Sequence, residues 1–291
     1  MNCQEIGLVG HPLGHTMSPF IHEKLFDLSG IEYSYEIFDI SELFSSIKKL
    51  KNLDGFNITI PHKENIIKFL DSMDRQSQLC GSVNTVACRG GKMHGYTTDG
   101  AGCIKSLQDS GADIGGEILV LGNGGAARAL GFAFAALNST KSITLACRPG
   151  SRKAQKLKND LADFAGEKGI GVKLLTYDEL EQNREKYDLL LNATSVGMSP
   201  KAEASPVRGD TVCRCRLVFD AVYNPIDTQL IKIAEKYGIK TVRGMGMLVY
   251  QAAVAHEIWY GGSFKAEDLL QLCRQAELEM VNRQVREDNG K

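Results

Sequence analysis

The sequence predicts an α/β protein built from two domains, and three features support this prediction. The chain has 291 residues, a length that suits two modest domains or one large one. Short apolar or alternating segments, typical of strands, alternate with segments of helical pattern, as in a mostly parallel sheet covered by helices. A continuous apolar strand at residues 118–121 is followed at once by a glycine turn, a helix and a second strand, so a domain boundary is expected near residue 101.

The N-terminal hundred residues contain the elements of the first predicted domain. Residues 5–10 are expected to form a short buried strand, and a helix should begin at about Pro19, because proline is favoured in a first helical turn. Alternating residues predict a second strand over 31–40. A helix should follow over 40–51, with Ser41 as its candidate cap. A third strand (53–61), a helical segment (63–71) and a hairpin with a loop (81–100) complete the domain.

The second predicted domain begins with a βαβ unit. Its strands are expected at 118–121 and 142–147, with a helix of small residues over 126–137 between them. Later strands are expected within 187–198 and 217–225, each ending in a polar loop. Two helices follow, one over 228–238 that ends at Gly238 and one over 247–261 that closes at Gly261.

Composition and charge narrow the class of protein. Hydrophobic residues make up 43% of the chain and charged residues 24%, with a net charge of −1, so neither nucleic-acid nor membrane binding is expected. No apolar run approaches the roughly 18 residues of a membrane helix, and the N-terminus has no signal-peptide pattern. Eight scattered cysteines fit mostly free thiols and a cytoplasmic location.

Two groups of residues are candidate metal ligands. Cys213 and Cys215 form a C-x-C pair, but no second pair follows at zinc spacing. His11, His15 and His22 lie close in sequence without a set of cysteine or carboxylate partners. The sequence therefore predicts no metal site.

A glycine-rich turn indicates dinucleotide binding. It directly follows the strand at 118–121 and opens the helix, and a ligand-free close-packed turn is the alternative. The first glycine permits a tight turn, the second lets the backbone approach a pyrophosphate, and the helix N-terminus offers free N–H groups to the phosphates. The residues expected to bind cofactor here are Gly122, Asn123, Gly124, Gly125 and Ala126.

The end of the next predicted strand favours NADP over NAD. An NAD site usually has an Asp or Glu there, which binds the ribose hydroxyls. This chain has Arg148 and Arg152 and no carboxylate in that turn. Guanidinium groups suit a 2′-phosphate. A solvated basic turn is the alternative.

Pairs of uncharged polar residues lie in the predicted N-terminal domain. Thr16 and Ser18 are two apart, so in an extended segment their hydroxyls would face one side and could hold a carboxylate. Ser18 could equally be an N-cap. Asn57 and Thr59 repeat the spacing, with the isoleucines at 58 and 60 expected to face a core. Such residues suit a small, hydroxyl-rich anion, although singly each is more often a turn or cap residue.

Two further loops carry the charged candidates. Asn84 and Thr85 lie in one, and Thr98 and Asp99 lie in the other. Lys63 follows the strand end at 57–60 and is the candidate partner of Asp99. If the two side chains meet, Lys63 could exchange a proton with a hydroxyl or ketone while Asp99 holds it in place.

Several stretches, taken in order, resemble the shikimate dehydrogenase family from Ile6 to about Gly262. They are GHPLGHTMSPFIH, NITIPHK, GSVNT, YTTDG, GNGGAARA, NATSVGM, VYNP and GMGMLVYQAA. The resemblance implies two α/β domains with a cleft between them, residues 1–100 plus 245–291 binding substrate and residues 101–244 forming a Rossmann-type NADP-binding domain. It implies reversible reduction of 3-dehydroshikimate to shikimate with NADPH, on the route to chorismate and aromatic amino acids.

The resemblance also implies roles for single residues. Lys63 would transfer the proton, with Asp99 beside it. Thr16 and Ser18 would bind the substrate carboxylate. The rest of the substrate pocket would be Asn57, Thr59, Asn84, Thr98, Tyr223 and Gln251. The 2′-phosphate would lie on Arg148 and Arg152, and the nicotinamide side would include Ala221, Gly244 and Met247.

Three departures from the family pattern keep alternatives open. The family usually has serine at Thr16, asparagine at Thr97, and Asn-Arg-Thr where this chain has Cys147-Arg148-Pro149. A quinate or mixed quinate/shikimate dehydrogenase, with NAD possible as cofactor, is the first alternative. A non-catalytic NADP-binding regulator is the second. The expected partner is a small molecule, and the chain is expected to be a monomer or a homodimer.

Overall fold

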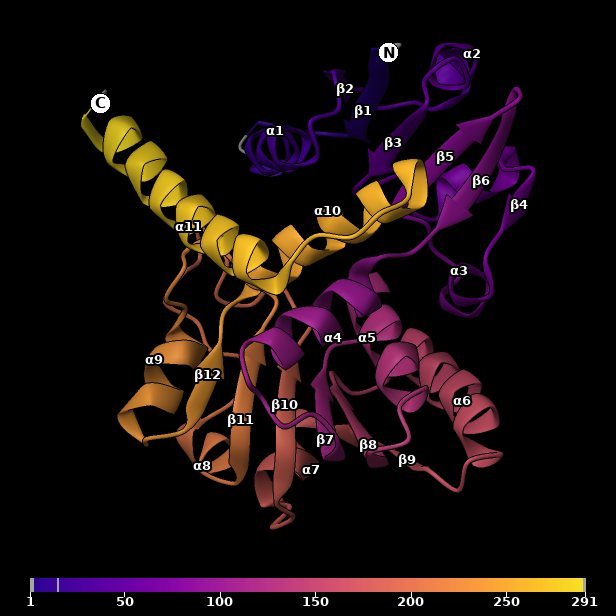
Figure 1. Ribbon diagram of the computed structural model, residues 1–291. Helices are drawn as coiled ribbons and strands as arrows, with labels where there is room; N and C mark the ends of the chain where they lie inside the picture. Colours follow the sequence, from indigo (N-terminus) through magenta and orange to yellow (C-terminus); the bar gives the residue numbers. More distant parts are fainter. Residues whose placement is uncertain (1–2, 15, 290–291) are drawn as a thin grey trace. The chain divides into compact units, whose positions relative to one another are not determined.

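The computed structural model describes residues 3–14 and 16–289. The chain divides into two compact units (Figure 1). The first comprises Met1–Gly102 and Leu248–Lys291, and the second Cys103–Met247. Two helices, α4 (Asp99–Asp109) and α10 (Gly244–Tyr260), each contain a boundary between the units.

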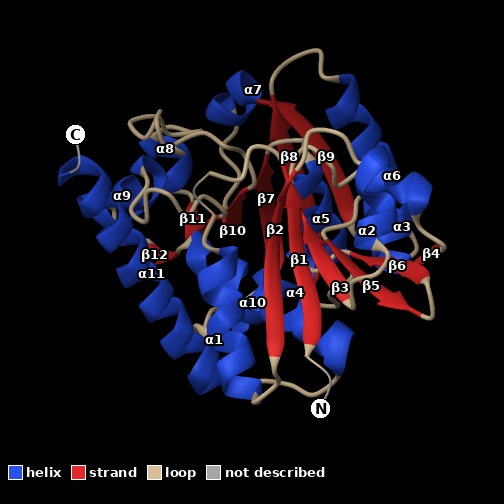
Figure 2. Cartoon of the chain, turned by 90° about the horizontal axis from the view of Figure 1, so that it is seen from above, coloured by secondary structure: helices blue, strands red, loops and turns tan. Residues whose placement is uncertain are grey.

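The first unit has a mixed six-stranded sheet. Its strands are β1 (Gln4–Gly10), β2 (Tyr33–Asp39), β3 (Gly55–Ile58), β4 (Ser72–Met73), β5 (Thr85–Arg89) and β6 (Lys92–Tyr96). They lie side by side in the order β2-β1-β3-β5-β6-β4 (Figure 2). β1 is parallel to β2 and β3, whereas β5 is antiparallel to β3 and β6. The antiparallel part follows from the Gly90-Gly91 turn, where both residues have the positive φ that a two-residue hairpin requires.

Helices of very different length accompany this sheet. They are α1 (Ser18–Ser29), α2 (Ile47–Leu50), α3 (Arg75–Cys80) and α11 (Ala266–Asn289), with 3₁₀ segments η1 (Phe44–Ser46) and η2 (Asn65–Phe69). The helix expected over 40–51 is wrong in extent, since only η1 and one α-turn form, and Ser41 caps neither. The N-cap reading of Ser18 is also wrong, because α1 starts at Ser18 with Met17 at its N-cap.

Apolar side chains from both faces of the first sheet fill two core clusters. One contains Phe38, Phe56 and Ile66, and the other contains Phe26 and Trp259. The indole of Trp259 donates a hydrogen bond to Val86 O over 2.9 Å, which fixes α10 on the sheet.

The second unit has the all-parallel sheet that the buried apolar strands predicted. Its strands are β7 (Gly116–Leu121), β8 (Thr140–Cys147), β9 (Gly171–Thr176), β10 (Tyr187–Asn192), β11 (Cys215–Asp220) and β12 (Lys240–Val242). Their order is β12-β11-β10-β7-β8-β9. Numbered within the unit, this is the strand order 3-2-1-4-5-6 of the Rossmann fold, whose ligands bind where the order reverses, at the carboxyl ends of β7 and β10.

Helices connect the parallel strands of the second unit. They are α5 (Gly125–Ala135), α6 (Arg152–Gly166), α7 (Tyr177–Gln182), α8 (Gly209–Val212) and α9 (Gln229–Lys236). The core residues Ile118 to Leu121 are fully buried, as are Leu189 to Leu191 in the neighbouring strand. Among the described residues, no helix is long and apolar enough to cross a bilayer.

Candidate functional site

A lysine–carboxylate pair forms the centre of the polar cluster in the first unit. Lys63 Nζ lies 2.7 Å from Asp99 Oδ2, with the lysine side chain 28% exposed and the aspartate 6%. Lys63 follows β3, while Asp99 is the first residue of α4, where the helix dipole favours a negative charge. The two side chains therefore meet as the sequence analysis required, with the amine the more accessible group.

Asn84 joins this pair to other predicted residues. Its Nδ2 lies 2.8 Å from Asp99 Oδ1, 3.0 Å from Thr98 Oγ1 and 3.1 Å from Gln251 Oε1. Its Oδ1 accepts a hydrogen bond from Thr98 N at 2.8 Å. Gln251 reaches the cluster because α10 lies close to α4: a Cβ on Gly102 would be 2.6 Å from Gln251 N.

Asn57 connects to the same cluster from β3. Its Nδ2 lies 3.1 Å from Thr85 Oγ1 and 3.3 Å from Asn84 O. The expected alternation holds at Ile58, which is 2% exposed, but it is wrong at Ile60, which is 73% exposed. Strand β3 ends at Ile58, so the period of two no longer applies at Thr59 and beyond.

Thr16 and Ser18 lie close together in space, but the segment that joins them is not extended. Met17 between them has helical φ and ψ angles, so the expected alternation of faces is wrong here. Thr16 Oγ1 instead accepts a hydrogen bond from Ser18 N at 3.2 Å. Arg283 on α11 donates from Nη1 to Thr16 O over 3.1 Å, and its Nε is held by Glu279 at 2.8 Å. No sequence pattern indicated that α11 contacts this loop.

The cofactor turn has the geometry of a phosphate cradle. Gly122 has a φ of +108°, in which other residues are strained, and a Cβ there would be 3.0 Å from Thr194 Cγ2. A Cβ on Gly124 or Gly125 would meet nothing within 4 Å. These two glycines open α5, and Gly122, Asn123 and Gly124 line a hollow, so a pyrophosphate could approach the helix N-terminus there.

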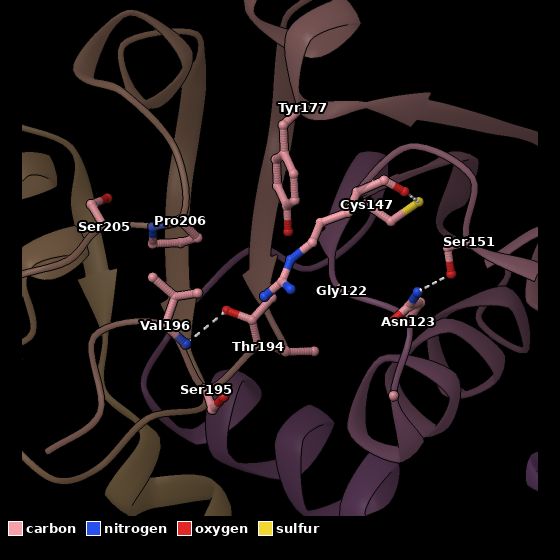
Figure 3. Close-up of a pocket in the computed structure, with 13 residues that line it drawn as sticks. Gly122, Asn123, Cys147, Ser151, Tyr177, Thr194, Ser195, Val196, Ser205 and Pro206 are labelled. Carbon is pink, nitrogen blue, oxygen red and sulfur yellow. Dashed lines mark hydrogen bonds between the residues drawn. The ribbon is translucent and has the colours of Figure 1, made fainter. Parts of the chain in front are cut away.

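A hollow of about 640 Å³ adjoins this turn (Figure 3). Sequence reasoning missed several of its lining residues, among them Tyr177, Thr194, Ser195 and Val196. Asn123 Nδ2 donates to Ser151 Oγ over 2.5 Å, which joins the turn to the start of α6. The positions of 194–196 after β10 could have been found from the rule that ligands bind at the carboxyl ends of strands.

A buried carboxylate shapes the loops at the end of β10 and β11. Asp220 Oδ1 accepts from Asn192 Nδ2 at 2.8 Å and from Val222 N at 3.0 Å, and Oδ2 accepts from Thr228 Oγ1 at 2.6 Å. Asn192 Oδ1 in turn accepts from Thr194 Oγ1 at 2.7 Å. Burial raises the pKa of Asp220. This network holds Thr194 against the hollow.

A second hollow of about 320 Å³ contains the two arginines expected to select NADP. Arg148 and Arg152 line it together with Ser151, Thr176 and Glu179. The Glu179 carboxylate is engaged in capping α7, accepting from Thr176 N at 2.7 Å and from Thr176 Oγ1 at 2.8 Å. Those hydrogen bonds hold the pKa of Glu179 below its usual value. The unengaged charges in the hollow are therefore cationic.

Four other predicted residues lie in the second unit at the end of β11 or the start of α10. Ala221 and Gly244 are in close contact, since a Cβ on Gly244 would be 2.6 Å from Ala221 O. Met247 is 8% exposed. Burial raises the pKa of Tyr223, whose hydroxyl is therefore neutral at ordinary pH.

Two of the histidines considered for metal binding have other partners. His11 Nδ1 lies 2.7 Å from Asp39 Oδ1, and His22 Nδ1 lies 3.1 Å from His256 Nε2. His15 lies outside the described residues. Cys213 is exposed and Cys215 buried. Within residues 3–14 and 16–289, no three His, Cys, Asp or Glu side chains gather as metal ligands would.

Comparison with known proteins gives consistent matches. The family model described as "Shikimate dehydrogenase substrate binding domain" matches residues 8–86. The chain is 40% identical to a shikimate dehydrogenase (NADP(+)) of Methanococcus maripaludis, over 88% of this chain and 91% of the relative. A Listeria monocytogenes shikimate 5-dehydrogenase, solved with shikimate and NAD, superposes with a TM-score of 0.83 at 30% identity, covering 93% and 96% of the two chains. The Thermus thermophilus enzyme, solved with NADP(H) and shikimate, gives 0.79 and 30%, covering 94% and 99%.

Proposed function

Because this chain belongs to the shikimate dehydrogenase family, we propose that it catalyses the reversible, NADP-dependent reduction of 3-dehydroshikimate to shikimate. The observation that carries this proposal is the Lys63–Asp99 pair, 2.7 Å apart and joined through Asn84 to the side chains of Thr98 and Gln251. A non-catalytic regulator would have no need of such a pair.

Proton transfer is the task of Lys63. In the oxidation direction its amine takes the proton of the reacting hydroxyl, and in the reduction direction it returns a proton to the ketone oxygen. Asp99 holds the amine in position, with its Oδ2 2.7 Å from Lys63 Nζ. The buried Asn84 fixes Asp99 from the other oxygen.

Substrate binding is the task of hydroxyl and amide groups. The carboxylate is held by Thr16 and Ser18. The ring hydroxyls are bound by Asn57, Thr59, Asn84, Thr98, Tyr223 and Gln251. These are neutral donors and acceptors, which suit a small polyhydroxylated acid and leave Lys63 and Asp99 as the charged groups of the reaction.

The second unit holds the cofactor. Bound NADP supplies the hydride chemistry. Gly122 to Ala126 receive the pyrophosphate at the start of α5, and Arg148 and Arg152 bind the 2′-phosphate. The open space at Gly124 and Gly125 and the two arginines in one hollow support this fit. Ala221, Gly244 and Met247 are assigned to the nicotinamide side.

Each of the two domains is assigned one function. Residues 1–100 and 245–291 form the substrate-binding and catalytic domain, and residues 101–244 form the cofactor domain. The protein acts in the cytoplasm as a monomer or homodimer, on the route to chorismate and aromatic amino acids. Free thiols at Cys88, Cys147, Cys213 and Cys215 agree with a reducing compartment.

The test compares enzyme activity with two substrates, each combined with two cofactors. Purified protein is assayed with shikimate or quinate, each with NADP or NAD. The proposal expects the highest kcat/KM with shikimate and NADP. Faster turnover of quinate would replace the substrate assignment, and equal use of NAD would remove the role of the arginine pair. Absence of turnover in all four combinations would refute the enzyme assignment.

A further inference from the structure

Two buried polar residues end neighbouring strands at the point where the strand order of the second unit reverses. Asn192 ends β10 and Asp220 ends β11, and they are direct partners in the parallel register of these strands. Asn192 is also the register partner of Leu121, the last residue of β7 before the cofactor turn. Both polar residues are fully buried. The proposed function assigns no role to either of them.

The orientation of the Asn192 amide is fixed on both sides by its hydrogen-bond partners. Its Oδ1 lies 3.1 Å from Thr194 N, a backbone N–H that can only donate. Its Nδ2 lies 2.8 Å from Asp220 Oδ1, which also accepts from Val222 N over 3.0 Å and is therefore an acceptor. Oxygen must face Thr194 and nitrogen must face Asp220, so a flipped amide would lose both hydrogen bonds.

The second oxygen of Asp220 joins the pair to a helix. Asp220 Oδ2 lies 2.6 Å from Thr228 Oγ1, which also caps α9 by accepting from Ile231 N at 3.3 Å. A carboxylate accepts the Thr228 hydroxyl proton, and a protonated carboxyl group would donate to the same oxygen, so Oδ1 stays an acceptor in either case. Asp220 therefore connects the ends of β10 and β11 to the start of α9.

The Thr194 hydroxyl has its donor role assigned by the same reasoning. It lies 2.7 Å from Asn192 Oδ1, an acceptor, so its proton points there. It also accepts from Val196 N over 3.1 Å (Figure 3). No proton is left for a ligand, so this hydroxyl cannot donate to a phosphate oxygen. The Thr194 methyl group faces the cofactor turn, because a Cβ on Gly122 would be 3.0 Å from Thr194 Cγ2.

We propose that Asp220 and Asn192 are positioning residues for cofactor binding. Asp220 fixes the amide of Asn192, and that amide holds the loop 194–196 in place as one wall of the cofactor hollow. All three loop residues line this hollow, whereas Asn192 and Asp220 are not among the described residues that line it. The pair therefore acts through the loop and does not contact the cofactor. The inference rests on the proposed function for the identity of the ligand, NADP.

A network that only stabilises the second unit is the alternative. Three of its hydrogen bonds end on the loop, at Thr194 N, Thr194 Oγ1 and Val196 N. An apolar pair of similar size would avoid the desolvation of a buried carboxyl group but could not hold the first two of these groups. Both readings predict lower stability when the pair is removed, so cofactor affinity must be measured separately from stability.

The first test measures NADPH binding to the full chain by fluorescence titration without substrate. Asp220→Ala removes the acceptor of the Asn192 amide. Asp220→Asn keeps an acceptor oxygen for that amide and for Val222 N, and its own nitrogen can donate to Thr228 Oγ1. We expect the dissociation constant of NADPH to rise about tenfold in the Ala variant, the value of one or two hydrogen bonds. It should stay within about threefold of wild type in the Asn variant.

Leu161→Ala is the matched control for lost stability. Leu161 is fully buried on α6 of the same unit and packs against α5, since a Cβ on Gly131 would be 2.9 Å from Leu161 Cδ1. The control should lower the unfolding temperature by several degrees and leave the NADPH dissociation constant within about twofold of wild type. In the enzyme assay, Asp220→Ala should raise the KM for NADP about tenfold and leave the shikimate KM within about twofold.

The outcomes separate the two proposals. Unchanged NADPH affinity in Asp220→Ala, or equal losses of affinity in the Ala and Asn variants, would overturn the positioning role. If Asp220→Ala does not fold, Thr194→Val decides, because it keeps the shape of the loop residue and removes its hydrogen bonds to Asn192 and Val196. It should weaken NADPH binding about tenfold, and wild-type affinity would overturn the proposal. If the wild type binds NADPH but does not oxidise shikimate, the proposed function fails while the binding result stands.

Discussion

The buried histidine pair should make the stability of the first unit sensitive to mild acid. In the unfolded chain His22 and His256 take up protons near pH 6.5. In the folded chain burial lowers the pKa of His22 well below that value and lowers the pKa of His256 to about 3. The unfolded state therefore binds more protons below pH 6.5, and the free energy of unfolding should fall as the pH falls through this range.

The magnitude follows from linkage. Each histidine that stays neutral costs about 1.4 kcal/mol for each pH unit below 6.5. An unfolded histidine is half protonated at pH 6.5, so between pH 6.5 and 5.0 the loss should be about 1.7 kcal/mol per histidine, or about 3 kcal/mol for the pair. Carboxylates with a lowered pKa, such as Asp39 and Asp71 in the same unit, contribute only nearer pH 4. The window from 6.5 to 5.0 therefore isolates the histidines.

The single tryptophan makes the assay specific to the first unit. Trp259 is the only one in the chain and packs beside His256, with ring centroids 5.7 Å apart. Urea unfolding followed by its fluorescence at pH 6.5, 6.0, 5.5 and 5.0, without cofactor, gives the free energy of unfolding at each pH. His256→Phe should lose about half of the slope, and His94→Phe should keep all of it. A wild-type free energy that is constant across this window would refute the assignment of two neutral buried histidines.

Four further substitutions test the proton transfer, the cofactor preference, the packing of the second unit and the carboxylate loop. Asp99→Asn keeps the shape but removes the charge beside Lys63, so kcat for shikimate oxidation should fall by about 10²–10⁴ while shikimate binding, measured by calorimetry, is kept. Replacing Arg148 and Arg152 together by alanine should raise the KM for NADP about 10- to 100-fold, the value of one or two charge-assisted hydrogen bonds, and leave the KM for NAD nearly unchanged. Gly244→Ala places a Cβ 2.6 Å from a backbone oxygen, so thermal unfolding of the second unit should shift down by several degrees for about 1–3 kcal/mol of strain. Arg283→Ala removes the hydrogen bond to Thr16 O and should raise the shikimate KM about fivefold with kcat unchanged, whereas the exposed Arg286→Ala should change neither.

Local patterns predicted the second unit best. The βαβ unit at 116–147 could be recognised because a buried parallel strand, a glycine turn and a helix of small residues are all local features. The β5–β6 hairpin was predicted for the same reason. Strand β4, of two residues, and the short α3 were not, because a period cannot be read from so few residues.

Errors in the first unit arise where loops override local preference. The segment at 40–51 has a helical pattern, but only a 3₁₀ turn and a single α-turn form within it, and its buried residues Leu43 and Leu50 belong to the core cluster of Phe38 and Phe56. Thr16 and Ser18 were treated as an extended pair, whereas Met17 has helical angles as the N-cap of α1. The identity of the polar residues could be predicted there, but their geometry could not.

The long-range contacts of the site were least accessible to sequence reasoning. Gln251 meets Asn84, Arg283 meets Thr16 O, and His256 meets His22, each across more than 160 residues. No local pattern specifies such contacts. The resemblance to the family identified Gln251 alone among these partners from the C-terminal helices.

Lys63 is the residue proposed to move the proton in shikimate oxidation. The most direct measurement is kcat with shikimate and NADP for wild type and Lys63→Ala side by side, with shikimate affinity measured in both by calorimetry. We expect turnover in the wild type, a loss of about 10²–10⁴ in kcat in the variant, and a shikimate affinity within a few-fold of wild type. A variant with undiminished kcat would contradict the role of Lys63, and a wild type without turnover of shikimate would contradict the function itself.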